Sequence, residues 1–168
     1  MRAWRLRVND EPLAFVDRLQ GRVLQHLESD VGDFVLRRAD GLFAYQLAVA
    51  VDDEFQAISD VVRGADLLAS TPRQIWLQSC LGYATPRYAH LPVASNAASE
   101  KLSKQTLAPA LDVGQAGPTL VRALNFLGQG VPAELSAAPP AEVWTWALAH
   151  WSFAAIPRRP SIPLVILP

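Results

Sequence analysis

Alternating apolar and polar residues fill most of the first forty positions of the chain. At the start, Trp4, Leu6 and Val8 alternate with basic or small residues, a period of two that is typical of a strand with one buried face. Glycine and aspartate turn signals separate further stretches of the same kind. The pattern therefore predicts a series of short strands, over residues 3–8, 13–19, 22–27 and 34–38.

The next segment is almost entirely apolar. Residues 43–51 read Phe-Ala-Tyr-Gln-Leu-Ala-Val-Ala-Val, and periodicity cannot separate a buried strand from a buried helix here. Asp52, Asp53 and Glu54 follow. Because three consecutive acids cannot all face one metal ion on a regular element, we expect a solvated turn there. β-Branched residues then predict a strand over 58–62.

A helix is predicted over residues 73–81. Ser70 and Thr71 offer a capping hydroxyl, and Pro72 suits the first helical position. Gly82 suits the end, because glycine readily adopts the left-handed conformation that stops helices.

A strand predicted over 87–91 completes a strand–helix–strand order. This order is typical of a parallel α/β sheet, in which ligands bind at the carboxyl ends of the strands. Arg63 follows the strand at 58–62, and a lysine-containing loop, residues 101–105, follows the strand at 87–91. We therefore expect both at the ligand-binding edge of the sheet.

The character of the chain changes after this loop. Pro118 and Gly128 bracket one helical segment, and a second helix with tryptophans at helical spacing is predicted over 141–151. Prolines from Pro157 onward exclude a helix and predict an extended or irregular tail. The predicted order is a partial α/β domain, a helical region and the tail, at residues 1–112, 113–156 and 157–168.

Composition restricts the possible functions. Hydrophobic residues make up 51% of the 168 positions and charged residues 18%, so the chain can bury a core. The net charge of −1 argues against holding nucleic acid by bulk electrostatics. Cys80 is the single cysteine, which excludes an internal disulfide and a cysteine-cluster zinc site within these residues and fits a reducing, cytoplasmic setting. No apolar run approaches the length of a membrane span.

The loop at 101–105 reads Lys-Leu-Ser-Lys-Gln. Lys101 and Lys104, with the hydroxyl of Ser103 between them, can surround a polyphosphate with mobile positive charge while an activated group is transferred. Taken alone, such a stretch is more often a solvated loop. The segments upstream favour the polyphosphate-binding interpretation over a solvated loop.

Three ordered segments carry a family resemblance: GLFAYQLAVAVDD at 41–53, VVRGADLLASTPRQ at 61–74 and KLSKQ at 101–105. Together they resemble the second catalytic half of the class I glutamyl-tRNA synthetase group, and most closely its short members, the glutamyl-Q tRNA(Asp) synthetases. The resemblance runs from Arg5 to about the helix at Ala141. The fold class it implies is α/β, the second half of a Rossmann-type class I catalytic domain followed by a small helical carboxyl-terminal region.

The resemblance implies an enzyme that activates L-glutamate with ATP and transfers it to queuosine in the anticodon of tRNA(Asp), acting as a cytoplasmic monomer. It implies that Tyr45 contacts the substrate glutamate and that Arg63 pairs with one of its carboxylates. It also implies catalytic roles for Lys101, Ser103 and Lys104 of the loop. Within the loop, the resemblance implies that Lys104 is the lysine that contacts ATP.

Several of these residues also have a purely structural interpretation. From spacing alone, Tyr45 is more often a core tyrosine with a satisfied hydroxyl. Arg63 can form an ion pair with Asp66 or Asp53. His90 is expected to be partly buried, and no ligand role is assigned to it or to the other histidines.

The chain departs from the family in three ways. Gln105 stands where ordinary glutamyl-tRNA synthetases usually carry arginine, and the residues after the loop leave no room for their helical anticodon-binding domain; both differences favour the short members. The family's amino-terminal half, with its His-x-Gly ATP signature and its cysteine-rich zinc site, has no counterpart here. We therefore expect the isolated chain to be inactive and, with apolar sheet edges uncovered, to self-associate.

Two other interpretations stay open. The chain can be a fragment of an ordinary glutamyl-tRNA synthetase, which charges glutamate tRNA at its 3′ end. It can also be a binding module that kept the fold and lost catalysis, which requires tight binding of tRNA or nucleotide without turnover. The near-neutral charge argues mildly against autonomous tRNA binding.

Overall fold

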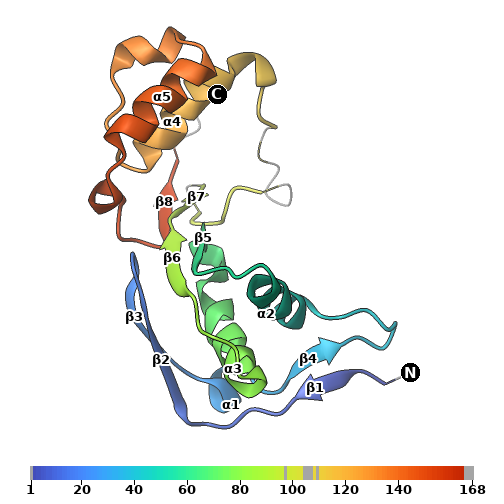
Figure 1. The fold of residues 1–168 in the computed structure, drawn as a ribbon. Helices are drawn as coiled ribbons and strands as arrows, with labels where there is room; N and C mark the ends of the chain where they lie inside the picture. Colours follow the sequence, from blue (N-terminus) through green and yellow to red (C-terminus); the bar gives the residue numbers. More distant parts are fainter. Residues whose placement is uncertain (1, 97, 104–107, 109, 165–168) are drawn as a thin grey trace. The chain divides into compact units, whose positions relative to one another are not determined.

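The computed structural model describes residues 2–96, 98–103, 108 and 110–164 (Figure 1). The chain divides into two compact units, residues 1–90 and 91–168. The first unit carries Arg63, and the second carries the start of the loop at 101–105. The sequence-based division at residue 112 stays a prediction about where the synthetase-like domain ends.

Two antiparallel strand pairs form the start of the first unit (Figure 1). β1 (Trp4–Leu6) pairs with β4 (Phe34–Arg37), and β2 (Pro12–Asp17) pairs with β3 (Gly21–His26). A single helical turn, α1 (Leu27–Asp30), follows β3. The four strands overlap the ranges that the alternating pattern predicts, which confirms these strands.

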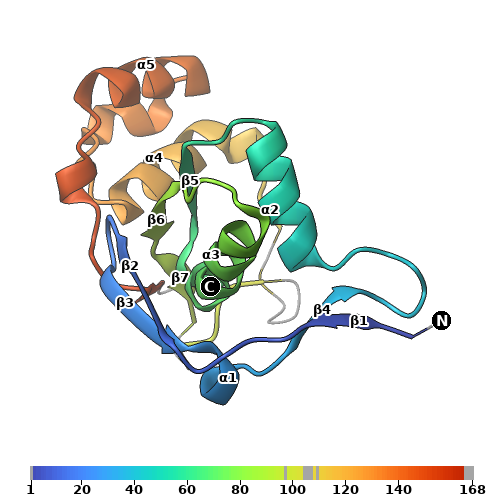
Figure 2. The ribbon, with the colours of Figure 1, turned by 60° about the horizontal axis from the view of Figure 1, so that its bottom comes forward.

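Helices and strands alternate in the rest of the first unit. α2 (Tyr45–Phe55) is followed by β5 (Asp60–Gly64), a 3₁₀ segment (Ala65–Ser70), α3 (Thr71–Leu81) and β6 (Arg87–Leu91). β5 pairs with β6, so the predicted strand–helix–strand order is confirmed. α2 and α3 lie side by side in both views (Figure 1 and Figure 2).

α2 resolves the ambiguous apolar segment in favour of a helix. Ala50 is buried, whereas Phe55 at the end of the helix is exposed. The helix continues through Asp52, Asp53 and Glu54, so the turn predicted there is wrong. The side chains of Asp52 and Glu54 are exposed to water in the last turn of the helix. Because their charges stay solvated, consecutive acids are compatible with a helix there.

α3 ends where the sequence predicts and begins at Thr71, two residues before the predicted start, but the role expected of a capping hydroxyl is different. Pro72 lies in the first turn, and Gly82, with φ of 71°, ends the helix. The Ser70 hydroxyl accepts a hydrogen bond from Nη2 of Arg73 at 3.1 Å. A capping side chain needs an extended backbone, and Ser70 is already helical because the 3₁₀ segment leads directly into α3.

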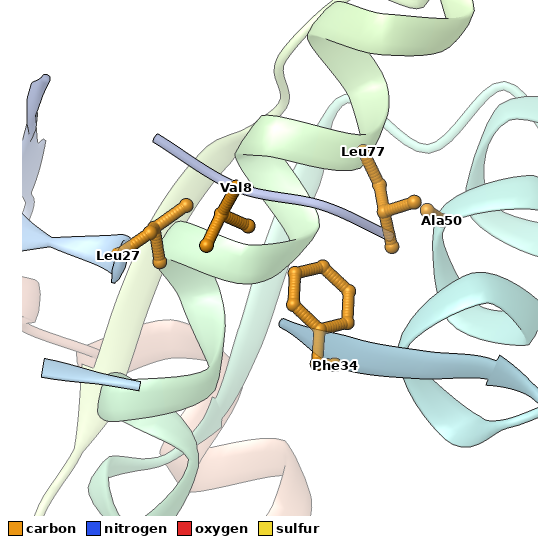
Figure 3. Packing of buried hydrophobic residues seen from close by; sticks show 5 residues of the cluster. All are labelled: Val8, Leu27, Phe34, Ala50 and Leu77. Carbon is orange, nitrogen blue, oxygen red and sulfur yellow. The ribbon is translucent and has the colours of Figure 1, made fainter. Parts of the chain in front are cut away.

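A hydrophobic core joins the elements of the first unit (Figure 3). Val8, Leu27, Phe34, Ala50 and Leu77 come from five different segments and are all buried. Fully burying a leucine or phenylalanine side chain contributes about 1.5–3 kcal/mol. Because Leu77 belongs to α3, this core fixes α3 against the strands and the neighbouring helix.

The second unit contains two longer helices and a pair of short strands. α4 (Ala116–Phe126) packs against α5 (Pro140–His150), which confirms both predicted helices. β7 (Val93–Ser95) pairs in parallel with β8 (Ser161–Pro163) in the proline-rich tail. The extended conformation expected of the tail is therefore confirmed at β8, while its pairing was not predicted. Short 3₁₀ segments complete the unit, at Val113–Gln115, Ala133–Ala137 and Phe153–Ala155.

No helix among the described residues combines the length and the apolar character needed to cross a bilayer.

Candidate functional site

Arg63 lies at the centre of a hydrogen-bonded network in the first unit. Its Nε donates to Nε2 of His90 at 3.0 Å. Its Nη2 donates to the hydroxyl of Thr71 at 2.8 Å and to Oε1 of Gln74 at 2.7 Å. All three acceptors are uncharged side chains. The structural interpretation of Arg63 predicts instead an ion pair with Asp66 or Asp53. β5 supplies the arginine and the first turn of α3 supplies Thr71 and Gln74, so the connection from β5 to α3 builds half of the network.

Asp17 and His90 form the other half, and both side chains are fully buried. Oδ2 of Asp17 accepts from Nδ1 of His90 at 2.6 Å. Oδ1 of Asp17 accepts from the backbone N–H groups of Leu19 and Gln20, both at 2.9 Å, and from that of His90 at 3.2 Å. Nε2 of the Gln20 side chain donates to the backbone carbonyl oxygen of His90 at 2.8 Å. These bonds fasten the end of β2 to β6.

Burial and hydrogen bonding set the charges of this pair. Burial alone raises the pKa of Asp17, but the N–H of Gln20, the His90 ring and further N–H donors outweigh it and leave the pKa below its usual value. Burial lowers the pKa of His90, Asp17 opposes this effect, and the charge of Arg63 adds to it. At neutral pH the pair is therefore a carboxylate beside an uncharged imidazole.

The ring of Tyr88 lies against the network. The guanidinium carbon of Arg63 is 5.6 Å from the Tyr88 ring centroid, a cation–π distance. Tyr88 also stacks on His90, with centroids 6.1 Å apart and planes at 15°. Burial raises the pKa of Tyr88, although a hydrogen bond from Gln78 opposes the shift, so the phenol is uncharged at neutral pH.

One guanidinium nitrogen of Arg63, Nη1, forms no hydrogen bond to the described residues. An arginine side chain has five N–H groups. Within the described chain, the hydrogen bonds of Arg63 use the N–H of Nε and the two of Nη2. Nη1 carries the other two, and the side chain is partly exposed. A carboxylate can therefore meet Arg63 at Nη1, while the protein itself fills the edge formed by Nε and Nη2.

α2 brings two further residues of interest to the first unit. Asp53 is close enough to Arg63 for the positive charge to act on it, but burial is the larger effect and raises the pKa of Asp53. Tyr45 is the first residue of α2 and is 51% exposed. The interpretation of Tyr45 as a core tyrosine is therefore wrong, and its contact with glutamate stays a prediction.

The second unit holds the described part of the lysine loop. Lys101 is exposed, and its backbone forms an antiparallel bridge with Ser95 of β7. Asn96 organises the turn between them, because its Oδ1 accepts two backbone N–H groups at 2.9 and 3.0 Å. Lys104, expected to contact ATP, lies outside the described residues. The catalytic roles expected of Lys101, Ser103 and Lys104 stay predictions.

The sequence did not point to Asp17, and it predicted a partly buried His90 without a functional role. The partial burial is wrong, because the His90 side chain is fully buried. Asp17 and His90 lie 73 positions apart and come from separate strands. A signal was nevertheless present. Asp17 occupies a predicted strand with Phe15 and Leu19 on the same face. A carboxylate that is buried there needs hydrogen-bond partners elsewhere in the chain.

Residues 3–127 match the family described as tRNA synthetases class I (E and Q), catalytic domain. The chain belongs to this family. The match includes β5, α3 and β6, which supply most of the Arg63 network, and the whole of the lysine loop. The expected fold, part of a class I synthetase catalytic domain, is thereby confirmed.

Three curated relatives carry the name Glutamyl-Q tRNA(Asp) synthetase. The protein of Dechloromonas aromatica is 69% identical over 167 residues, which cover 99% of this chain and 54% of the relative. The protein of Thiobacillus denitrificans is 55% identical over 161 residues, covering 96% and 54%. That of Pseudomonas fluorescens is 53% identical, again covering 96% and 54%. The chain spans about half the length of these relatives.

Solved structures support the fold assignment. A glutamate-tRNA synthetase from Elizabethkingia anophelis superposes with a TM-score of 0.67 at 19% identity, covering 94% of this chain and 35% of that structure. A glutamate tRNA ligase from Elizabethkingia meningosepticum, solved in complex with its amino acid, gives a TM-score of 0.63 at 20% identity, covering 90% and 34%. At these identities the likeness concerns the fold alone.

Proposed function

We propose that this chain is part of a cytoplasmic, monomeric ligase that activates L-glutamate with ATP and attaches it to queuosine in the anticodon of tRNA(Asp). The observation that carries the proposal is the 69% identity, over 99% of the chain, to a protein named Glutamyl-Q tRNA(Asp) synthetase. Because the chain spans about half of such relatives, the complete activity also needs residues of the kind found in their other half.

Arg63 and Tyr45 bind glutamate in this proposal. The Nη1 group of Arg63 offers two N–H donors and a fixed positive charge, and its guanidinium is already oriented by His90, Thr71 and Gln74. A carboxylate oxygen of the substrate can accept one of these N–H groups in a charge-assisted hydrogen bond. Tyr45 offers a hydroxyl on a rigid apolar ring and is accessible at the start of α2.

The lysine loop serves ATP in this proposal. A carboxylate oxygen of glutamate attacks the α-phosphorus of ATP, and the bond to the β,γ-pyrophosphate breaks, so negative charge develops on the leaving group. Lys101 and Lys104 carry ammonium groups on flexible stems that can follow this charge, and Ser103 can donate a hydrogen bond to a phosphate oxygen. The activated glutamyl group is then transferred to queuosine, and its bond to the phosphate breaks, which releases AMP.

The residues of this chain do not fit the zinc site of the family. Such a site is rich in cysteine, and this chain has one cysteine, Cys80, which is exposed. Among the described residues, no group of three potential metal ligands comes together. No step of the proposed reaction within this chain is therefore assigned to a metal of that site.

A joined protein tests the proposal. In it, this chain replaces the matched 54% of the Dechloromonas aromatica relative, and the uncovered remainder of the relative is kept. The joined protein is incubated with ATP and labelled glutamate, and with tRNA(Asp) that carries queuosine, tRNA(Asp) that lacks it, or tRNA(Glu). We expect ATP-dependent label on queuosine-containing tRNA(Asp) alone, with the intact relative as the positive control.

The other outcomes separate the competing interpretations. Label at the 3′ end of tRNA(Glu) would identify a portion of an ordinary glutamyl-tRNA synthetase. Tight binding of tRNA without any label, under conditions in which the intact relative is active, would identify a binding module that has lost catalysis. Either result would overturn the proposed function.

A further inference from the structure

The hydrogen bonds around His90 determine where its ring proton lies. An arginine Nε always carries a proton and can only donate. Since Nε of Arg63 lies 3.0 Å from Nε2 of His90, that ring nitrogen is the acceptor and carries no proton. The proton of the uncharged ring is then on Nδ1, which lies 2.6 Å from Oδ2 of Asp17 and donates to it.

Asp17 enforces this arrangement. Its carboxylate accepts three backbone N–H groups in addition to the Nδ1–H of His90. A carboxylate accepts and does not donate, so His90 can satisfy it only with a proton on Nδ1. The opposite tautomer would place Nε2–H against the Nε–H of Arg63, two donors face to face, with the hydroxyl oxygen of Thr71 at 3.2 Å as an acceptor for Nε2–H. It would leave both the Asp17 carboxylate oxygen and the Nε–H of Arg63 without their partner on His90. The tautomer with its proton on Nδ1 satisfies both, and the Thr71 hydroxyl can then donate to Nε2.

The network is asymmetric in its exposure. Asp17, His90, Thr71 and Gln74 are each at most 1% exposed, whereas Arg63 is partly exposed. Four buried side chains therefore hold one side chain that reaches the surface. A histidine that served only to fill the core would not need both ring nitrogens bonded to charged partners.

We propose that Asp17 and His90 are positioning residues for Arg63: Asp17 holds His90 with its proton on Nδ1, and the bare Nε2 then fixes the guanidinium so that Nη1 faces the ligand. That the ligand is a glutamate carboxylate rests on the proposed function. The arrangement of protons does not depend on it.

The charges around His90 agree with this role. Asp17 and Arg63 lie on its two ring nitrogens, Asp66 acts on it electrostatically, and the uncharged ring of Tyr88 stacks on it. Burial lowers the pKa of His90, so the ring stays uncharged and its acceptor nitrogen stays available to Arg63 at neutral pH.

Nitrogen NMR of the 168-residue chain with ¹⁵N-labelled histidine tests the proton positions directly, because protonated and bare ring nitrogens differ widely in chemical shift. The sequence has three histidines, and the His90→Gln variant identifies the signals of His90. At pH 7 we expect a protonated Nδ1 and a bare Nε2. A proton on Nε2, or on both nitrogens, would overturn the proposal without bearing on the proposed ligase function.

The Asp17→Asn variant changes the proton position with little change in shape. Its Oδ1 can still accept the backbone N–H groups, but its NH₂ then faces Nδ1 of His90 and donates to it. His90 must move its proton to Nε2, opposite the Nε–H of Arg63. The same substitution in a serine-protease triad leaves the geometry intact and produces the wrong tautomer. We expect the NMR signals of His90 to show the reversed tautomer.

The joined protein measures the consequence for the ligand. For Asp17→Asn we expect the KM for glutamate to rise by at least about tenfold, the effect of losing one hydrogen bond to a charged group, with a smaller change in kcat. His26 provides the matched control, because it forms an exposed pair with Asp10. His26→Gln should leave the KM for glutamate unchanged.

Two substitutions of His90 keep the test decisive if Asp17→Asn does not fold. The amide of glutamine can reach the position of Nε2, whereas the amide of asparagine reaches only the position of Nδ1. His90→Gln should therefore retain more of the glutamate affinity than His90→Asn. An active joined protein in which neither change, nor Asp17→Asn, raises the KM would overturn the positioning role. An inactive unsubstituted joined protein would count against the proposed function instead, while the NMR result would still decide the arrangement of protons.

Discussion

Arg63 combines a fixed orientation with an accessible donor group. Three of its N–H groups are satisfied by His90, Thr71 and Gln74, and these bonds hold the plane of the guanidinium. In the proposed function, a carboxylate oxygen accepts one N–H of Nη1, and the fixed plane of the guanidinium restricts its angle of approach before the ligand arrives. A lysine at this position could not reproduce the arrangement, because its single ammonium group has three donors on a flexible stem.

At this scale the lowered pKa of His90 predicts a pH dependence of stability. Burial is its largest cause, opposed by Asp17 and reinforced by Arg63. An unfolded histidine takes up a proton below about pH 6.5 and the folded His90 resists doing so, hence the free energy of unfolding of the first unit should fall as the pH drops below about 6.5. Above that pH both states are uncharged and the effect vanishes. The pKa of Asp17 is also lowered, so its contribution persists until the pH falls through that lower pKa.

Amide hydrogen exchange at β2 and β6 between pH 7.5 and 5, corrected for intrinsic exchange rates, measures this effect within the first unit. The His90→Gln variant should be less stable at pH 7.5 and should lose less stability on acidification than the parent chain. His26→Gln, which removes the exposed histidine, should follow the parent. If the parent chain and His90→Gln lose the same stability between pH 7.5 and 5, the assignment of the pH dependence to His90 is refuted.

The residues of the site could be predicted from the sequence only where they belong to local motifs. Tyr45 and Arg63 lie in segments that resemble a family, so their roles could be proposed from the chain alone. Asp17 and His90 act through a contact between two strands that are remote in sequence. Their pairing follows from the fold, which no spacing rule within one segment describes.

At the scale of elements, local signals predicted α3 well because Pro72 and Gly82 act on the backbone of their own helix. α2 was ambiguous because nearly every residue of the segment is apolar, and its packing beside α3 decided the outcome. The pairing of β7 with β8 was not predicted, since parallel strands separated by two helices leave no short-range pattern.

Two glycines of the second unit allow an element-scale prediction. Gly128 and Gly130 both have positive φ, 75° and 60°. A Cβ on Gly128 would lie 2.2 Å from the carbonyl oxygen of Ala155, whereas a Cβ on Gly130 would meet no atom within 4 Å among the described residues. Gly128→Ala should therefore destabilise the second unit by about 1–3 kcal/mol more than Gly130→Ala, the cost of overpacking beyond the shared backbone strain.

Urea unfolding followed by tryptophan fluorescence compares the two variants, because Trp144, Trp146 and Trp151 lie in the second unit. The matched backbone conformation makes Gly130→Ala the control for the strain of an L-residue at positive φ. Equal destabilisation by the two substitutions would show that the end of α4 does not depend on its close approach to the 3₁₀ segment that contains Ala155.

At the scale of the whole molecule, the chain spans about half the length of its curated relatives, and large apolar side chains are exposed in both units. Phe55 and Val113 are each 90% exposed. Apolar surface that reaches water favours association with other surfaces of the same kind.

We therefore expect the isolated 168-residue chain to self-associate as its concentration rises, with a sedimentation coefficient that increases accordingly. The joined protein, which supplies the remainder of a relative, should sediment as a monomer over the same range. An isolated chain that stays monodisperse and unfolds cooperatively would contradict this expectation.

The central claim is that Arg63, held by its buried partners, binds a carboxylate of glutamate in a tRNA ligase. The most direct test is kcat/KM for glutamate in the joined protein carrying Arg63→Lys, which keeps the charge and removes the guanidinium. Arg87→Lys is the matched control, because Arg87 forms an exposed ion pair with Asp60 at 2.6 Å and such pairs contribute little. We expect Arg63→Lys to lower kcat/KM by about a hundredfold and Arg87→Lys to leave it nearly unchanged. Equal activity of the Arg63→Lys variant and the parent would contradict the account.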